Sequence, residues 1–239
     1  MKLIDGVEAI DLSLYLPDSK TLVFADFHIG FEQSLESQGV LVPRFQFKDI
    51  IKRLEKIFAR VKPATIVING DLKHEFGEIS RQEWNDCLAL IDFLASKCEH
   101  IILIQGNHDT ILGPIARKRN LEVVNSYSAG DIFITHGDKL PEQELVKSIK
   151  TIIIGHEHPA IELAEAAKKE KYKCFLVGKW KGRALVVQPS FNLITEGTDV
   201  AKQTLLSPFL QQNLASFEVF IIDDKKNEIL TFGKLKNIN

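Results

Sequence analysis

Short apolar runs, each ending at a group of Asp, Asn or His residues, most restrict the fold of this 239-residue chain. Five such runs are rich in Val, Ile, Leu and Phe and are bounded by polar or glycine residues, as is typical of buried strands. They lie at Thr21 to Ala25, Ala64 to Asn69, Ile101 to Gln105, Asp131 to Thr135 and Thr151 to Ile154. Longer amphipathic segments lie between such runs, so the pattern predicts an α/β protein.

Two of the amphipathic segments predict helices. Each carries apolar residues on one helical face: Ile50, Leu54, Ile57 and Phe58 in the first, and Trp84, Leu88, Ile91 and Ala95 in the second. Ser80 and Glu83 have the spacing of a capping box at the start of the second helix. Further strands are predicted at Tyr172 to Val177, Ala184 to Gln188, Phe217 to Asp223 and Glu228 to Phe232, with a hairpin turn at Asp223 to Asn227.

Polar side chains that can bind metal follow directly after the five strands. Of the seven histidines, only His100 lies outside this pattern, and we interpret it as structural. The residues after the strands are Asp26, His28, Asp71, His74, Asn107, His108, His136, His156 and His158. Because open α/β sheets bind their ligands at the carboxyl ends of strands, we expect these side chains to share one site.

The mixture of carboxylate, imidazole and amide groups predicts the kind of site. Such O/N sets suit Mn²⁺, Fe²⁺ or Zn²⁺ better than Ca²⁺ or a structural zinc ion. The number of ligands predicts two ions. We expect the pairs Asp26/His28 and His156/His158 to lie on extended backbone, which would point both members of a pair to one side.

At this point the sequence resembles the calcineurin-like metallophosphoesterase superfamily. Five segments, in order, match its D-x-H, G-D, G-N-H-D/E, H and G-H-x-H motifs: Asp26–His28, Gly70–Asp71, Gly106–Asp109, His136 and Gly155–His158. The resemblance covers roughly Thr21 to Asn192. It implies a four-layer α/β/β/α sandwich of two mixed sheets, formed here by residues 1–239 as a single domain.

The resemblance also implies a role for each motif residue. The first metal would bind Asp26, His28 and His158, and the second would bind Asn107, His136 and His156, with Asp71 bridging both. His108 would contact the phosphate and protonate the leaving oxygen, and Asp109 would hold and polarise His108. A hydroxide shared by the two ions would attack phosphorus. We expect both ions to be Mn²⁺, and Fe²⁺, Zn²⁺ or a mixed pair are the alternatives.

Two segments depart from the motifs. His74 stands where an acidic residue is common, which leaves its role open between a substrate contact, support of a ligand and a surface histidine. The turn Gln188 to Asn192 resembles an N-P-G-S turn but lacks the glycine. Lys73 and Arg44 are candidate phosphate contacts, although solvated side chains are the simpler interpretation of both.

The smaller relatives that share the segments around His74, His156 and Asn192 are archaeal and bacterial phosphoesterases. They are related to nuclease subunits of double-strand-break repair and to DNA-ligase-associated phosphoesterases. This resemblance implies a phosphodiesterase or nuclease that acts on nucleic acid or nucleotides in DNA repair. A homodimer and DNA-processing partner proteins are compatible with it. A phosphomonoesterase acting on a small metabolite or phosphoprotein, and a binding scaffold without turnover, are the alternatives; the intact ligand set argues against the scaffold.

Two later segments stay open. Lys168 to Arg183 places seven basic residues among Tyr172, Phe175 and Trp180, which suits either a nucleic-acid backbone or an exposed helix end and edge hairpin. Glu196 to Gln212 has the weak periodicity of a loop with a short helix, or of an interface.

Composition excludes several classes of protein. The net charge of -2 is not that of a basic nucleic-acid binder, although it leaves room for a local basic patch. The three cysteines, Cys87, Cys98 and Cys174, are widely spaced and predict reduced thiols. The N-terminus lacks the apolar core of a signal peptide, and no run approaches a membrane-spanning length. We therefore expect a cytoplasmic protein with no membrane partner.

Overall fold

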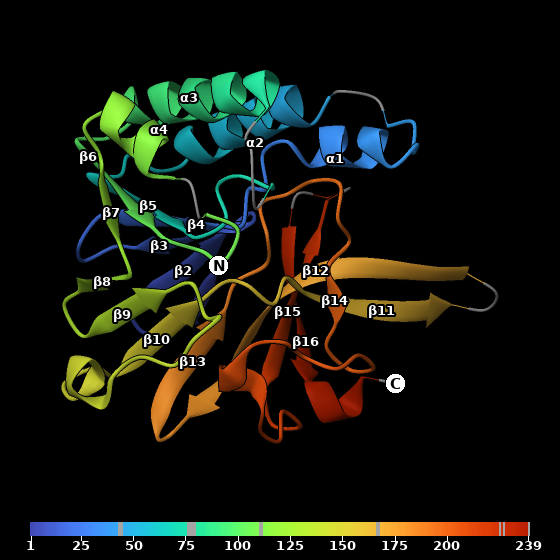
Figure 1. The fold of residues 1–239 in the computed structure, drawn as a ribbon. Helices are drawn as coiled ribbons and strands as arrows, with labels where there is room; N and C mark the ends of the chain where they lie inside the picture. The colour runs from blue at the N-terminus through green and yellow to red at the C-terminus, as the bar shows by residue number, and fades with distance from the viewer. Residues whose placement is uncertain are drawn as a thin grey trace.

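Two β-sheets pack against each other in the computed structural model, which describes residues 1–42, 45–75, 80–109, 112–165, 168–224, 226 and 228–238 (Figure 1). The first sheet takes its strands from the first half of the chain and the second sheet from the second half. Arg44 and the residues 225 and 227 of the predicted hairpin turn lie outside the described residues.

The first sheet runs in chain order from an antiparallel meander into a parallel half. Its strands are β1 (Lys2–Ile4), β2 (Val7–Ile10), β3 (Ser13–Leu16), β4 (Thr21–Ala25), β5 (Thr65–Asn69), β6 (His100–Ile104) and β7 (Glu122–Val124). Strands β1 to β4 pair antiparallel, and β4 to β7 pair parallel. The parallel half brings the carboxyl ends of β4, β5 and β6 to one edge.

The second sheet is also mixed. Its strands are β8 (Ser126–Ala129), β9 (Ile132–Thr135), β10 (Thr151–Ile154), β11 (Pro159–Glu165), β12 (Lys168–Trp180), β13 (Arg183–Val187), β14 (Thr198–Asp199), β15 (Glu218–Asp223) and β16 (Glu228–Lys234). Strand β10 pairs parallel with β9 on one side and with β13 on the other, so the carboxyl ends of β9 and β10 lie together.

The described α-helices all belong to the first half of the chain and lie over the outer face of the first sheet (Figure 1). They are α1 (Phe31–Ser37), α2 (Gln46–Phe58), α3 (Arg81–Ala95) and α4 (Gly113–Lys118). The 3₁₀ turns are η1 (Gln143–Val146), η2 (Pro208–Leu210) and η3 (Leu235–Asn237). In the described part of the chain, 3₁₀ turns and loops cover the outer face of the second sheet, and Phe209 and Phe217 pack against that face. None of the described helices is both long and apolar enough to cross a membrane.

Side-chain alternation divides the core between the two faces of the second sheet. On β10, Ile153 faces the core shared with the first sheet, whereas Ile152 and Ile154 pack into the outer core with Phe209. Successive side chains of a strand point to opposite faces of the sheet. This alternation explains why β10 reads as a continuous apolar run: both of its faces are buried.

The structure confirms the predicted α/β class with two mixed sheets and all nine predicted strands. The five strands that precede the candidate ligands end within one residue of the predicted positions. Ile50, Leu54 and Ile57 of α2 are buried as predicted, whereas Ala95, at the end of α3, is exposed. Strand β12 is longer than predicted, because it pairs first with β11 and then with both β13 and β15.

Candidate metal centre

Seven side chains from five strand ends meet between the two sheets. Asp26 and His28 follow β4, Asp71 follows β5 and Asn107 follows β6 in the first sheet. His136 follows β9, and His156 and His158 follow β10, in the second sheet. Two groups have ligand atoms that all lie within 4.8 Å of one another: Asp26 with His28 and His158, and Asp71 with His136 and His156. Asn107 joins the second group, because its Oδ1 lies 2.9 Å from Nε2 of His136.

The atoms at the centre of these groups lack the partners that buried polar atoms normally have. Oδ1 of Asp26 is buried and has no hydrogen-bond partner in the described part of the chain. It lies 3.6 Å from Nδ1 of His136 and 3.6 Å from Nε2 of His158. Nε2 of His28 lies 3.3 Å from Nε2 of His158. A buried carboxylate oxygen without a hydrogen bond, close to imidazole nitrogens, fits a divalent cation, which would accept lone pairs from Asp26, His28 and His158.

Asp71 and His136, at the centre of the site, shift one another's pKa. Burial favours the neutral acid, but the hydrogen bond and charge of His136 hold the pKa of Asp71 well below its usual range. Burial opposes a charge on His136 as well, yet Asp71 and Asp26 raise its pKa to about 9. Burial and His158 lower the pKa of His28. In the metal-free protein a protonated His136 therefore balances the carboxylates, and a cation that binds there must displace that proton.

The ligand segments have a strained backbone. We expected extended D-x-H and H-x-H segments, and this prediction is wrong. Asp26, His28, Asp71, His156 and His158 have φ between 46° and 66°, in the left-handed region that side chains with a Cβ rarely adopt. Each such residue costs about 1–3 kcal/mol and persists only where the surrounding structure enforces it. The ligand pairs converge because the chain turns sharply at each of them.

Two glycines next to the ligands are required by close packing. A Cβ atom at Gly106 would overlap Oδ1 of Asp71, and a Cβ at Gly70 would overlap Nδ1 of His136. Both overlaps involve side chains of candidate ligands, which would have to move to make room. Glycine at these positions therefore lets the G-D and G-N-H loops approach the ligands closely.

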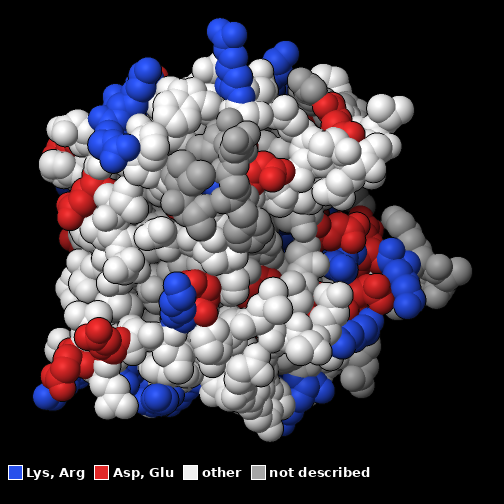
Figure 2. Space-filling model, in the orientation of Figure 1, with Lys and Arg blue, Asp and Glu red and all other residues white. Residues whose placement is uncertain are grey.

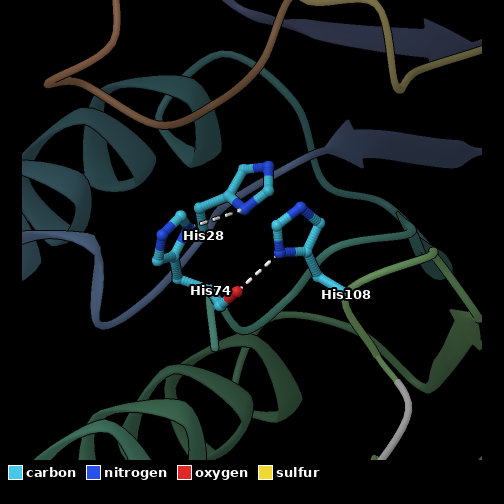
Figure 3. Close-up of side chains that lie close together, drawn as sticks. All are labelled: His28, His74 and His108. Atoms are coloured by element: carbon cyan, nitrogen blue, oxygen red, sulfur yellow. Dashed lines mark hydrogen bonds between the residues drawn. The ribbon is translucent and has the colours of Figure 1, made fainter. Parts of the chain in front are cut away.

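His108 and His74 lie beside the first group of ligands (Figure 3). The ring centroid of His108 is 4.8 Å from that of His28, and Nδ1 of His74 is 3.4 Å from Nδ1 of His28. The three histidines form a further group whose ligand atoms lie within 4.8 Å of one another. His74, whose role the sequence left open, is therefore close to the centre rather than on a remote surface. Burial and His108 lower its pKa.

Asp109 does not have the position that the resemblance implied. Its buried carboxylate faces backbone N–H groups of Gly106, Leu72 and Lys73, at 3.1, 3.4 and 3.4 Å. Nδ1 of His108 instead hydrogen-bonds to the main-chain carbonyl of His74, at 2.6 Å. Burial and Asp71 raise the pKa of Asp109 to about 6. Asp109 thus ties the G-D loop to the G-N-H loop, whereas His74 orients His108.

Lys73 is not the solvated side chain that we expected. It is fully buried, and Nζ donates to the main-chain carbonyls of Glu75 and His108, the latter at 2.6 Å. A buried ammonium needs such acceptors, and the two loops supply them. Lys73 consequently ties the loop of His74 to the loop of His108 and does not offer its charge to a phosphate.

The turn at Gln188 to Asn192 supports the first ligand segment from the second sheet. The N–H groups of Phe191 and Asn192 donate to the carbonyls of Ala25 and Asp26, at 2.7 and 3.1 Å. Lys173 donates from Nζ to Ser190 Oγ at 2.7 Å, to Ser190 O at 2.9 Å and to Asn192 O. Sequence reasoning missed this support. The lysine was one of many in a basic run, and nothing local marked it as buried.

The basic segment Lys168 to Arg183 does not form a stacking platform. Phe175 and Trp180 are buried, and Lys169 and Lys171 pair with Glu162 and Glu196. The segment contains no helix end, because residues 168–180 form strand β12. On the face seen in Figure 2, basic and acidic side chains are interspersed, with no continuous basic area. Glu196 to Gln212 contains β14 and the short 3₁₀ turn η2, which fits the predicted loop with a short helix.

Comparison with known proteins identifies what this arrangement is similar to. The calcineurin-like phosphoesterase family matches residues 19–178. No curated protein sequence matches the chain. Among solved structures, the nuclease MPE of Pseudomonas putida is 18% identical over 93% of this chain and 92% of that one, with a TM-score of 0.65. The phosphoesterase YfcE of E. coli and Vps29 of Cryptosporidium parvum are each 13% identical over 90% of this chain and 98% and 97% of theirs, with TM-scores of 0.42 and 0.41.

Proposed function

This chain belongs to the calcineurin-like phosphoesterase family, and we propose that it is a metal-dependent phosphodiesterase acting on nucleic acid or nucleotides. The observation that carries the proposal is the unpartnered, buried Oδ1 of Asp26 among the nitrogens of His136 and His158. A protein that used these residues only for packing would leave this buried carboxylate oxygen without a hydrogen bond, at a cost of about 1–3 kcal/mol.

Two divalent cations fit the ligand set, whose mixture of oxygen and nitrogen donors suits Mn²⁺, Fe²⁺ or Zn²⁺, and Mn²⁺ is the ion that we propose. Asp26, His28 and His158 would hold one, and Asn107, His136 and His156 the other. Oδ2 of Asp71 lies 3.6 Å from Nε2 of His28 and 3.4 Å from Nε2 of His136, a position that supports a bridging role. When bound, such ions supply Lewis acidity for the phosphoryl group and lower the pKa of water.

The side chains around the ions would handle substrate and protons. His108 lies next to His28 and is the residue that we assign to protonate the leaving oxygen. His74 stacks on His108 with ring centroids 5.4 Å apart, on the same side of the centre. We infer that these two histidines face the leaving group, whereas the seven ligands face the ions.

Diester substrates are proposed ahead of monoesters for two reasons. The smaller phosphoesterases that the sequence resembles are related to nuclease subunits of DNA repair, and one solved structure with a similar fold over more than nine-tenths of both chains is that of a nuclease. At 18% identity that likeness concerns the fold, so the substrate class rests on experiment. A phosphomonoesterase would use the same ions and is the competing outcome.

A substrate screen tests the proposal. The purified chain with Mn²⁺ would be given bis-p-nitrophenyl phosphate, p-nitrophenyl phosphate, cyclic nucleotides, and single- and double-stranded DNA and RNA. We expect turnover of the diesters that stops with chelator and returns with added Mn²⁺. Turnover confined to monoesters would replace the proposal with its alternative, and metal binding without any turnover would favour a scaffold.

A further inference from the structure

The hydrogen bond between His108 and the main chain decides which nitrogen of His108 can exchange protons. Nδ1 lies 2.6 Å from the carbonyl oxygen of His74 (Figure 3). A carbonyl oxygen only accepts, so Nδ1 must carry the hydrogen. Proton exchange with a substrate then takes place at Nε2. The peptide group that supplies this carbonyl therefore sets the tautomer of the acid that we assign to the leaving oxygen.

That peptide group is held from its other side by a buried carboxylate. The bond between His74 and Glu75 contributes its C=O to His108 and its N–H to Oε1 of Glu83, at 3.1 Å. The N–H of His74 donates to the same oxygen, at 3.0 Å. A carboxylate, a peptide and an imidazole thus form one hydrogen-bonded chain. Each bond in such a chain polarises the next and strengthens it.

Glu83 is built into the fold at this point. It belongs to the first turn of α3, its side chain is only 1% exposed, and burial raises its pKa. A Cβ atom at Gly30 would lie 2.8 Å from Cδ of Glu83, so glycine at that position leaves room for the carboxylate. The spacing of Ser80 and Glu83 predicted a helix cap, and Ser80 does accept from the N–H of Glu83 at 3.0 Å. The carboxylate of Glu83 has the separate task of holding the His74 loop.

We propose that Glu83 is a positioning residue for His108, acting through the peptide group between His74 and Glu75. The inference rests on the proposed function and takes the place of the role that the resemblance gave to Asp109. In the reaction, the bond from a water oxygen to phosphorus forms as the bond from phosphorus to the leaving oxygen breaks. The leaving oxygen takes the Nε2 proton of the doubly protonated His108 ring, which leaves His108 neutral with its hydrogen on Nδ1. The proton lost by the attacking water passes to solvent, and solvent protonates Nε2 of His108 again before the next turnover.

Comparing substrates with different leaving groups distinguishes a positioning role of Glu83 from a merely structural one, because loss of structure would slow the turnover of all substrates alike. p-Nitrophenolate departs as a stable anion and needs little help from an acid, whereas a nucleotide hydroxyl must be protonated as it leaves. Glu83→Gln keeps an oxygen acceptor but removes the charge, and Glu83→Met removes both. We expect each variant to keep its bound Mn²⁺ and its turnover of bis-p-nitrophenyl phosphate. Turnover of a dinucleotide should fall about 10–100-fold in Glu83→Met, as when other imidazoles lose an orienting partner, and by less in Glu83→Gln.

Glu55→Gln is the matched control, because Glu55 is exposed on α2, and it should leave both rates unchanged. Equal loss on both substrates, or no loss on either, in variants that retain Mn²⁺ would overturn the inference. A second measurement does not depend on turnover: nitrogen NMR shifts of the His108 ring in the metal-free protein. They should report the Nδ1–H tautomer in the parent chain and a mixed population in Glu83→Met. If the parent chain hydrolyses no diester, the proposed function fails, while these shifts still decide whether Glu83 orients His108.

Discussion

The Nε2 atoms of His28 and His158 lie 3.3 Å apart, although 130 residues separate them along the chain. Burial and His158 lower the pKa of His28, so His28 does not gain a proton easily. Two imidazole nitrogens that face one another beside the carboxylate of Asp26 can both bind a cation placed between them.

Binding of Mn²⁺ should therefore raise the thermal stability of the protein. A ligand at 100 times its dissociation constant stabilises the folded state by about 2.7 kcal/mol. For a chain of this size that corresponds to roughly 5–10 °C in melting temperature. His158→Ala should lose most of this shift, whereas His100→Ala, an exposed histidine outside the site, should keep it. A shift that survives in His158→Ala would place the ion elsewhere.

The ligand and acid roles can be separated by two substitutions. Asp71→Asn should lose bound metal and turnover together, because Asp71 lies within reach of both ligand groups. His108→Ala should keep the metal and slow nucleotide turnover by about 10²–10⁴-fold, the usual contribution of a positioned acid. Metal content by mass spectrometry and rates on the same samples would test both, with the exposed Asp5→Asn as control. An empty site in His108→Ala would contradict this division of roles.

Gly106→Ala should damage the metal centre from the backbone side. The added Cβ overlaps Oδ1 of Asp71, so either the loop or the ligand must move. Overpacking of this kind costs typically about 1–3 kcal/mol, and a displaced ligand should weaken Mn²⁺ binding as well. Calorimetric titration with Mn²⁺ measures the affinity. Among the described residues, Gly113→Ala at the start of α4 places its added Cβ near only the flexible end of Arg117, and this variant should bind Mn²⁺ normally.

Lys173 should make the stability of the fold depend on pH above neutrality. Burial and Arg53 lower its pKa from 10.5 to about 7. Between those values the unfolded chain binds more protons than the folded protein, so the free energy of unfolding rises with pH from about 7 to 10. Urea denaturation of the parent chain and of Lys173→Met should show this rise only in the parent. Lys169→Met, whose lysine is exposed, should behave like the parent; a flat profile in the parent would contradict the lowered pKa.

Much of the fold and the membership of the site could be predicted from the sequence. Runs such as Thr151–Ile154 are buried on both faces, and that burial leaves a clear signal in their composition. His156 and His158 could be assigned to a strand end for the same reason. Their left-handed backbone could not, because histidine has no local preference for that conformation.

The supporting contacts were beyond prediction because they depend on tertiary packing. Nothing near Lys73 in the sequence shows that its ammonium reaches two carbonyls of the site loops. Asp109 follows His108 directly, yet its carboxylate turns to the backbone of Gly106, Leu72 and Lys73. Glu83 has the spacing of a helix cap, and only the packing of α3 against the His74 loop reveals its contact with that loop.

The division of the ligands between the sheets makes the two halves of the chain depend on each other. Asp26, His28, Asp71 and Asn107 arrive on segments of residues 1–124, and His136, His156 and His158 on the remainder. Neither half carries the complete set of residues that we propose for either ion. Cation binding would therefore report whether the two halves have assembled. A chain whose halves had folded but not yet joined would bind the ions weakly, and each bound ion would stabilise the contact between the halves.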